Sequence, residues 1–142
     1  MLRLDRLNAK PRAQPPRCPY CGLPARFDDG SILRRSTPVW ICAGYPSCDA
    51  YVGCHPRSNI PLGSLANAAL RQGRSSVHMR MDQYWRYSGG KLTRKAMYQI
   101  VATAMQRRSF HAGTAREQDI EAFDAAWPLI GRLARRAIAA AP

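Results

Sequence analysis

The pattern of apolar and polar positions divides the chain into a strand-forming part and a helical part. Residues 38–42 and 50–53 are short runs rich in β-branched and aromatic side chains, which are typical of strands. Residues 31–35, which follow the turn-forming sequence Asp-Asp-Gly, are expected to form another short strand. Beyond residue 63 the apolar side chains recur at helical spacing instead. The pattern therefore predicts a small antiparallel sheet followed by helices.

Two helices are expected in the first half of the helical part. Ser64 is a suitable N-cap for a helix over residues 65–72. A second helix is expected over residues 77–87, with Ser75 or Ser76 as its cap. Alternatively, one helix continues through Gly73 at a cost of about 1 kcal/mol.

The second half of the helical part contains two start signals. Thr93 can cap a helix over residues 94–108, whose apolar side chains lie on one face. The sequence Thr114-Ala-Arg-Glu117 is a capping box for a further helix. Pro128 interrupts the pattern that follows, because proline removes a helical hydrogen bond, so two helical pieces are expected on either side of it.

These elements predict an α+β protein with four segments. The segments are expected at residues 1–17 (a flexible basic arm), 18–55 (a four-cysteine zinc ribbon of short antiparallel strands), 56–63 (a linker with two prolines and a glycine) and 64–142 (a small domain of three or four short helices). The basic residues of the arm are Arg3, Arg6, Lys10, Arg12 and Arg17.

Charge is distributed unevenly along the chain. The formal net charge is +13, from 22 Lys and Arg against 9 Asp and Glu. Residues 61–112 hold nine basic side chains against one acidic, whereas residues 113–142 hold four of each. Nineteen of the basic residues are Arg, whose planar guanidinium forms bidentate contacts with phosphates. This charge favours an anionic partner, most simply nucleic acid, although abundant Arg and Ala are also typical of a GC-rich genome.

Four cysteines occur in two short knuckles, Cys18-Pro-Tyr-Cys21 and Cys42-Ala-Gly-Tyr-Pro-Ser-Cys48, separated by twenty residues. Zinc prefers four tetrahedral ligands of this kind, and each knuckle can supply two thiolates. The spacing predicts one structural zinc ion, because four protein ligands leave no position open for water. The alternatives are a disulfide pair, which favours secreted domains, and a redox Cys-x-x-Cys, which needs a following helix where this chain has turn-forming residues.

The cellular compartment is predicted from the cysteines and from two signals that the sequence lacks. A membrane span needs about 18 consecutive apolar residues, and the sequence has no such run. The N-terminal stretch lacks the apolar core that a secretory signal contains. Metal-binding cysteines without such a signal are typical of a reducing compartment. A cytoplasmic protein without a membrane partner is therefore expected.

The cysteine knuckles resemble part of a known family. Cys18-Pro-Tyr-Cys21-Gly, followed by Trp40-Ile-Cys42-Ala-Gly-Tyr45-Pro-Ser-Cys48, is similar to the C-terminal zinc ribbons of bacterial type IA topoisomerases. Those ribbons contact single-stranded DNA. The resemblance covers about a third of the chain and implies a zinc ribbon that contacts nucleic acid.

A longer signature resembles a family of small zinc-finger-containing proteins encoded by phages and bacterial genomes. Its parts are Cys18-Pro-Tyr-Cys21-Gly, Cys48-Asp-Ala-Tyr-Val-Gly-Cys54-His55, Pro61-Leu-Gly-Ser-Leu-Ala66, Leu70-Arg71-Gln-Gly-Arg74, His78 with Asp82 and Trp85, and His111-Ala-Gly113. The signature spans roughly residues 18–113. It implies a phage or mobile-element context in a bacterial host cell.

A nucleic-acid interface would use basic side chains of the helical part together with the ribbon. The candidates for phosphate contacts are Arg71, Arg74, Arg80, Arg86, Lys91, Arg94 and Lys95, and the ribbon candidates for bases or backbone are Arg34, Arg35, Trp40 and Tyr45. Aromatic side chains in so small a sheet more often cover its apolar face, so Trp40 in particular has a structural alternative.

A second polar set consists of His55, His78, Asp82 and His111. His78 and Asp82 are four residues apart and share one helix face. If the helices fold back on the ribbon, the set could form a second metal site or an acid–base pair. The structural alternative is that Asp82 accepts hydrogen bonds from His78 or from an arginine of its own helix.

The favoured interpretation is a non-enzymatic zinc-ribbon protein that binds nucleic acid, with DNA favoured, through a basic helical face. The alternative is a protein-interaction module that inhibits or redirects a host complex, with an acidic host or phage protein as its partner. A metal-dependent nuclease using His78 and Asp82 is the third hypothesis. A Mg²⁺ site needs further acidic groups, however, and residues 61–112 contain Asp82 alone.

Overall fold

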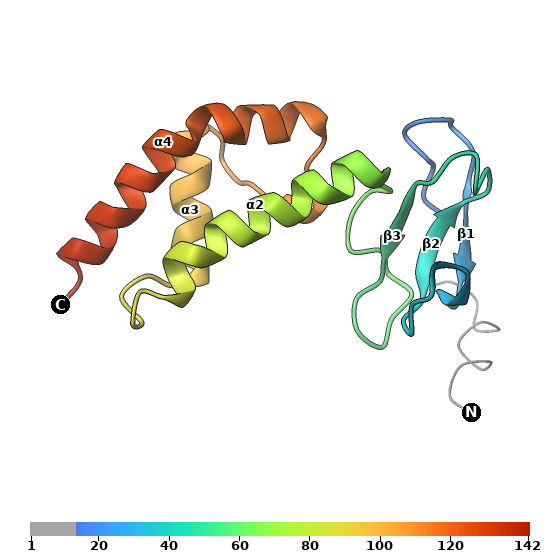
Figure 1. Cartoon of the computed structure of the whole chain (residues 1–142), viewed down its shortest axis with the longest axis horizontal. Coiled ribbons are helices and arrows are strands. Elements are labelled where there is room, and N and C mark those ends of the chain that lie inside the picture. The colour runs from blue at the N-terminus through green and yellow to red at the C-terminus, as the bar shows by residue number, and fades with distance from the viewer. Residues whose placement is uncertain (1–13) are drawn as a thin grey trace. The chain divides into compact units, whose positions relative to one another are not determined.

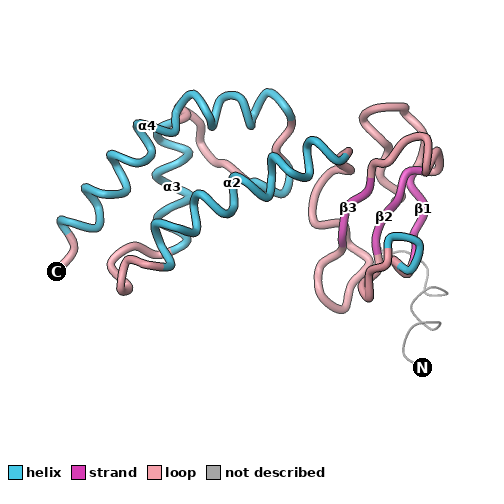
Figure 2. Tube along the Cα trace, in the orientation of Figure 1, coloured by secondary structure: helices cyan, strands magenta, loops and turns pink. Residues whose placement is uncertain are grey.

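The computed structural model describes residues 14–142, so the predicted basic arm lies outside the described residues except for its last four positions. Within residues 14–142 the chain forms two compact units, the first ending at Ala69 and the second beginning at Leu70. All strands of the described residues lie in the first unit, and the second unit is helical (Figure 1, Figure 2). The predicted α+β class is confirmed. None of the helices in residues 14–142 combines the length and the apolar character that crossing a membrane requires.

The first unit is built on a three-stranded antiparallel sheet. Its strands are β1 (Ala25–Asp28), β2 (Val39–Cys42) and β3 (Tyr51–Gly53), in the order β1-β2-β3. Trp40 of β2 lies opposite Phe27 of β1. All four residues of β2 are buried, as expected for a continuous apolar run in a central strand.

The side chain of Trp40 lies in the core of this unit. It is 1% exposed, and its ring centroid lies 5.3 Å from that of Phe27. Its indole N–H donates a 2.7 Å hydrogen bond to the carbonyl of Asn59. A buried indole with a satisfied N–H offers no face to a base. The prediction that Trp40 contacts nucleic acid is therefore wrong, and its structural alternative holds.

Residues 31–35 do not form the predicted strand. Ser31–Leu33 is instead a short 3-10 helix, η1. The carboxylates of Asp28 and Asp29 accept hydrogen bonds from the backbone N–H groups two residues ahead, at 2.9 and 2.8 Å. Gly30 adopts φ +88°, which other residues rarely take. The turn that begins at Asp-Asp-Gly therefore extends through η1, and strand β1 precedes this turn.

The predicted linker, residues 56–63, lies in the first unit and leads into a further strand-like pairing. Tyr51 of β3 pairs with Ala66 in an antiparallel bridge. The two residues exchange backbone hydrogen bonds of 3.1 and 3.0 Å. Because this pairing holds the chain extended, the next helix does not begin at residue 65.

Helix α2 (Ala68–Arg86) starts later than predicted and is continuous. The backbone N–H of its first residue donates to the carboxylate of Asp49 at 3.2 Å, in place of the predicted cap at Ser64. The helix passes through Gly73, so the single-helix alternative is the one observed. Ile120 packs on α2 at Gly73, where a Cβ would lie 3.4 Å from it, an ordinary van der Waals distance.

Helix α3 (Arg94–Ala104) begins where the sequence predicts and ends four residues earlier. The hydroxyl of Thr93 accepts a 3.1 Å hydrogen bond from the N–H of Ala96, which confirms the predicted N-cap. The N–H of Arg107 donates to the carbonyl of Ala102 at 2.8 Å, and this pairing turns the chain out of the helix.

Helix α4 (Glu117–Ala140) is a single helix with Pro128 inside it, so the predicted division into two pieces is wrong. Proline removes one hydrogen bond and bends the axis, and α4 changes direction along its length (Figure 1). Buried side chains on both sides of the proline hold the two halves to one core. The carboxylate of Asp119 accepts a 2.8 Å hydrogen bond from the N–H of Arg116 and caps the helix, in place of the predicted capping box.

One apolar core lies between α2, α3 and α4 in the second unit. Met81 of α2, Val101 of α3 and Phe123 of α4 are each at most 1% exposed. Phe110, in the segment between α3 and α4, stacks on Phe123 with ring centroids 5.8 Å apart. The core therefore fixes the segment that follows α3 as well as the helices.

Candidate zinc centre and basic pocket

Two turns of the first unit place the knuckle cysteines around one point. Cys18 and Cys21 lie in the turn before β1, where the N–H of Gly22 donates to the carbonyl of Cys18 at 2.9 Å. Cys42 ends β2, and Cys48 lies in the turn that follows. The four Sγ atoms all lie within 4.8 Å of one another.

The spacing of the sulfur atoms fits one tetrahedral zinc ion. At a Zn–S distance of about 2.3 Å, tetrahedral sulfur ligands are about 3.8 Å apart. The Sγ atoms of Cys18 and Cys48 are 3.6 Å apart, and those of Cys21 and Cys42 are 3.3 Å apart. The cysteines of the described chain form no disulfide. The predicted single structural zinc ion is confirmed.

Burial and backbone groups set the protonation of the buried ligands. Burial raises the pKa of Cys18, but hydrogen bonds from the backbone of Cys21 and Tyr20 outweigh it, so that the pKa of Cys18 is lowered. Burial raises the pKa of Cys42 to about 12, even though the N–H of Gly44 donates to its sulfur at 3.4 Å. Zinc binds the thiolate form of each cysteine, so its binding releases protons and is coupled to the folding of both knuckles.

A family model covers this arrangement together with most of the chain. Residues 14–133 match a family described as a zinc-finger-containing domain. The chain belongs to this family. The match extends through α2 and α3 into α4, so the helices are part of the family's domain and not an addition to it. No curated protein and no solved structure matches the chain.

Arg74 of α2, predicted to bind a phosphate, is a structural residue. It is 8% exposed, and its Nε–H donates to the carbonyl of Ala115 at 2.9 Å. A buried guanidinium that is hydrogen-bonded to the backbone is not presented to a ligand. The assignment of Arg74 to a phosphate contact is therefore wrong.

Other arginines of α2 are engaged within the second unit. Arg80 pairs with Asp124 at 2.7 Å, and Arg86 pairs with Asp82 at 3.2 Å. Arg71 is half-buried. An arginine that already pairs with a carboxylate contributes less binding free energy to a phosphate contact, because the existing ion pair must first be broken. The predicted basic face is therefore weak along α2.

The second polar set forms no metal site. Apart from the knuckle cysteines, no three His, Cys, Asp or Glu side chains in residues 14–142 come within ligand distance of one another. Asp82 accepts a 2.8 Å hydrogen bond from the indole N–H of Trp85 and forms an ion pair with Arg86. This arrangement is close to the structural alternative, in which Asp82 is engaged by an arginine of its own helix. Partial burial and the charge of Arg94 lower the pKa of His78 more than the nearby Asp82 raises it.

The remaining ribbon candidates stay accessible in the first unit. Arg34 and Arg35 are exposed beyond η1, and the guanidinium of Arg35 lies 5.7 Å from the ring centroid of Tyr51. Tyr45 is half-buried between the two ligands of the second knuckle. His55, of the second polar set, is exposed in the segment after β3.

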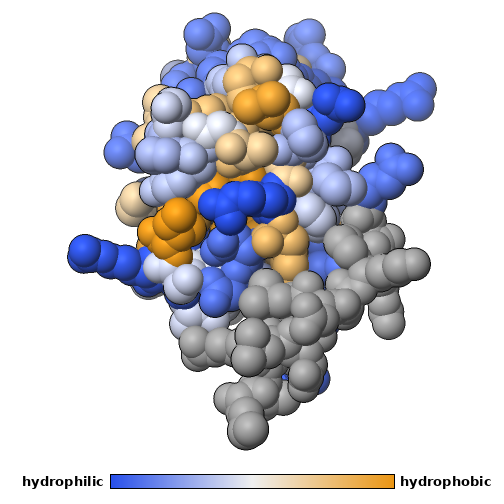
Figure 3. Space-filling view, turned by 90° about the vertical axis from the view of Figure 1, so that its right-hand side faces the viewer, coloured by the Kyte–Doolittle hydropathy of each residue, from blue (hydrophilic) through white to orange (hydrophobic). Residues whose placement is uncertain are grey.

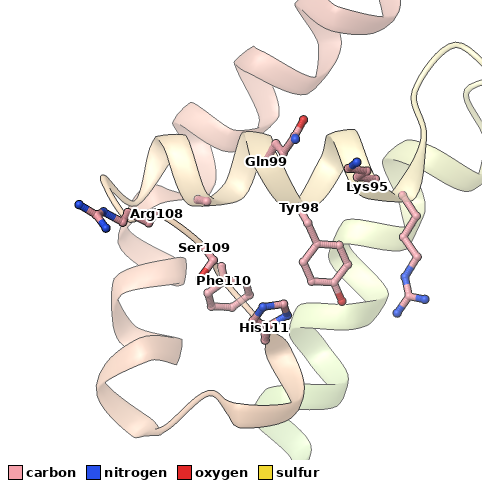
Figure 4. Close-up of a pocket in the computed structure, with 9 residues that line it drawn as sticks. Lys95, Tyr98, Gln99, Arg108, Ser109, Phe110 and His111 are labelled. Atoms are coloured by element: carbon pink, nitrogen blue, oxygen red, sulfur yellow. The ribbon is translucent and has the colours of Figure 1, made fainter.

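A pocket of about 600 Å³ opens in the second unit between α3 and the segment that follows it (Figure 4). It is lined by Arg94, Lys95, Tyr98, Gln99 and Ala102 of α3 and by Arg108, Ser109, Phe110 and His111 of the following segment. This volume lies within the range of ligand-binding pockets. Arg94, Lys95 and His111 are predicted candidates from two different sets, and the structure brings them to one place.

Aromatic side chains form the apolar surface of the pocket. Phe110 is 5% exposed and fixed by its stacking in the core. Tyr98 and His111 lie side by side with ring centroids 6.5 Å apart, whereas Arg108 extends away from them at the far end (Figure 4). The guanidinium of Arg94 lies 5.5 Å from the ring centroid of Tyr98.

The cations around the pocket have no carboxylate partner among residues 14–142. The ion pairs described in the second unit use Arg80, Arg86, Arg107 and Arg116. Arg94, Lys95 and Arg108 are exposed, and no acidic residue lines the pocket. The pocket therefore carries uncompensated positive charge beside aromatic rings.

A second hollow of about 610 Å³ shares Arg94 with this pocket. It is lined by Trp85, Arg86, Gly90, Leu92, Thr93 and Arg94. The predicted candidate Lys91 is exposed in the same turn between α2 and α3. The cationic surface thus continues from the pocket past the start of α3.

Three side chains of the pocket are not among the predicted site residues, namely Tyr98, Arg108 and Phe110. A signal for Tyr98 was present, because it lies four residues after Arg94 and shares its helix face. Arg108 lies inside the expected helix, which extends to residue 108, and no motif in the sequence marks Phe110. Because α3 ends at Ala104, the following segment turns back and places its side chains opposite the helix.

Proposed function

We propose that this protein binds nucleic acid, DNA in particular, through the pocket beside α3 and the cations around it. The observation that carries the proposal is the group of exposed cations Arg94, Lys95 and Arg108 around an aromatic pocket without an acidic lining residue. Phosphates require cations, and bases favour aromatic faces, so both parts of a nucleotide find a partner here.

The proposal moves the interface from α2 to α3 and the turn before it. Lys91, Arg94, Lys95 and Arg108 are exposed, and they would neutralise the phosphates. Arg74, Arg80 and Arg86 of α2 have carboxylate or backbone partners and would support the fold instead. Binding without catalysis is proposed, because the nuclease alternative lacks a cluster of ligands for a second metal in residues 14–142.

The ribbon is a second contact region in this proposal. Its support is the similarity of the two knuckles to the ribbons of type IA topoisomerases. Arg34, Arg35 and Tyr45 are the side chains that would contact the strand. Zinc would act on the fold alone, because four thiolates fill its coordination sphere.

We also place the protein in the cytoplasm of a bacterial cell, in a phage or mobile-element context. The signature over residues 18–113 supports this context. Four cysteines that are arranged to bind zinc support a reducing compartment.

The test is the binding of the zinc-loaded full chain to labelled single- and double-stranded DNA and RNA, measured by fluorescence anisotropy. Affinity should fall steeply between about 50 and about 200 mM salt, because phosphate contacts release counterions. The double variant Arg94→Ala/Lys95→Ala should reduce the salt slope by about 2, one unit for each lost contact.

The matched control is Arg132→Ala/Arg136→Ala, which removes two exposed arginines of α4 that do not line the pocket. It changes the net charge by the same amount and should leave the salt slope nearly unchanged. Absence of binding at low salt would overturn the proposal. Equal losses in the two double variants would show that the interface is not at α3.

A specific observation also favours the protein-interaction alternative. Large apolar side chains of the first unit are exposed, namely Tyr20, Leu23, Ile32, Ile60 and Leu62. One face of the molecule shows such apolar areas beside long hydrophilic side chains (Figure 3). A partner of this kind would be retained on the zinc-loaded protein after nuclease treatment and lost in the variant Leu23→Ser/Ile32→Ser.

A further inference from the structure

We propose that the pocket beside α3 receives one unpaired base of a single-stranded nucleic acid. The base would stack on Tyr98, and Arg94 and Lys95 would hold the adjoining phosphate. This inference rests on the proposed function and adds the form of the ligand, an open strand instead of a duplex.

The composition of the pocket points to a base and not to a phosphate alone. Surface cations are sufficient to hold a phosphate, which gains nothing from apolar walls. This pocket, however, is walled by Tyr98, Phe110 and His111 in addition to its cations. In a duplex the faces of the bases are covered by their neighbours, so an aromatic wall can be used by an unstacked base alone.

The contact between Arg94 and Tyr98 shows how the ring can exchange partners. In this structure the guanidinium lies 5.5 Å from the ring centroid. Arg94 is exposed and Tyr98 is half-buried, and none of the ion pairs among residues 14–142 uses Arg94. A base arriving at the ring would replace one planar partner by another and release the guanidinium for the adjoining phosphate.

The second hollow favours a strand over a free nucleotide. Arg94 lines both hollows. A phosphate at Arg94 would therefore adjoin two hollows, and a strand can use both where a single nucleotide uses one. Trp85 in the second hollow offers a further aromatic surface to the neighbouring base.

The experiment compares two oligomers of equal length and charge, oligothymidylate and an oligomer of abasic sites, at one fixed salt concentration. Wild-type protein should bind the oligomer with bases about 5- to 150-fold more tightly, the range for one stacked base. Thymidine monophosphate is added as a competitor. It should compete far more weakly than the oligomer, because it reaches a single hollow.

Three variants locate the effect. Tyr98→Leu keeps apolar packing and removes the ring, so it should abolish the preference for bases, and oligothymidylate should then bind no more tightly than the abasic oligomer. Tyr98→Phe keeps the ring and should retain the preference. Tyr87→Leu is the control, since Tyr87 is 85% exposed in the same unit and does not line the pocket.

The outcomes separate this inference from the proposed function. Equal binding of both oligomers, with steep salt dependence, would overturn the base pocket and leave nucleic-acid binding intact. Binding of duplex DNA as tightly as the single strand, or full competition by the mononucleotide, would also overturn it. Failure of both oligomers and of the duplex to bind would overturn the proposed function as well.

Discussion

The guanidinium of Arg94 lies over the ring of Tyr98, one helical turn further along α3, at 5.5 Å from the ring centroid. A cation and an aromatic ring four residues apart face the same side of a helix. In the proposed complex this pair joins the phosphate-binding and base-binding parts of the pocket. Its two components, charge and planar shape, can be separated by substitution.

Arg94→Lys is expected to weaken binding of single-stranded DNA about two- to fivefold without changing the salt slope. Lysine keeps the charge but loses the planar group that contacts both ring and phosphate. Arg94→Ala should lower the slope by about one in addition. Both slopes come from anisotropy titrations over a series of salt concentrations. An Arg94→Lys slope equal to that of Arg94→Ala would contradict this role.

Removal of zinc by a chelator is expected to unfold the first unit and to leave the helices of the second unit formed. The small sheet depends on the metal, because its core consists of a few side chains and the cysteines themselves. The second unit has an apolar core of its own. Far-UV circular dichroism should keep its helical signal, whereas the total tryptophan emission should shift partly to longer wavelength as the indole of Trp40 meets water.

Two cysteine variants check that this effect belongs to the cluster. Cys18→Ser should abolish stoichiometric zinc binding, since Cys18 is buried and contributes one of the four sulfur atoms. Cys54→Ser should keep one zinc per chain, because Cys54 is half-buried outside the cluster. Loss of zinc from both variants would show that Cys54 is a ligand.

The zinc site could be predicted from the sequence, whereas the partners of the arginines could not. Each knuckle is a local turn, so the spacing of its cysteines decides its geometry. Arg74 donates to the carbonyl of Ala115, 41 residues away, and Arg80 pairs with Asp124, 44 residues away. Which arginines stay free for a ligand therefore depends on how α2 and α4 meet, and this is a property of the core.

The pocket was missed for a related reason. Its side chains come from both sides of a chain reversal, and the apolar periodicity that predicts α3 does not indicate where the helix stops. The stop depends on the backbone pairing of Arg107 with Ala102. At Pro128 the opposite error occurs, because the sequence predicts an end of the helix where the helix continues. Buried side chains before and after the proline hold both halves of α4 to one core.

Asp119 is expected to make stability depend on pH at the acidic end. Burial raises the pKa of Asp119, but the hydrogen bonds from Arg116 and Arg107 and their charges outweigh it, so its pKa lies below the usual 3.8. A carboxyl with a depressed folded pKa stabilises the protein above its unfolded pKa, and this contribution is lost as pH falls through the folded value. Asp119→Asn should therefore lower the free energy of unfolding by about 1 kcal/mol at pH 7 and by less near pH 3.

Urea denaturation followed by circular dichroism at the two pH values gives this difference. Glu121→Gln is the control, because Glu121 is an exposed acidic residue of the same helix with no ion pair among residues 14–142. A pH-independent loss in Asp119→Asn would show that the cap geometry matters and the charge does not.

Gly73→Ala is expected to stabilise the protein, although the glycine lies where Ile120 packs on α2. A Cβ at Gly73 would meet carbon atoms of Ile120 at 3.4 to 3.8 Å, which is ordinary contact, so alanine adds packing without a clash. Alanine is also favoured over glycine inside a helix, and the free energy of unfolding should rise by about 0.5–1 kcal/mol.

Gly131→Ala in α4 is the comparison. Its Cβ would lie 2.9 Å from the hydroxyl oxygen of Tyr84, so the tyrosine must move and the gain should be smaller or absent. Urea denaturation of both variants measures the difference, and a destabilised Gly73→Ala would mean that Ile120 cannot yield the space that the new methyl group needs.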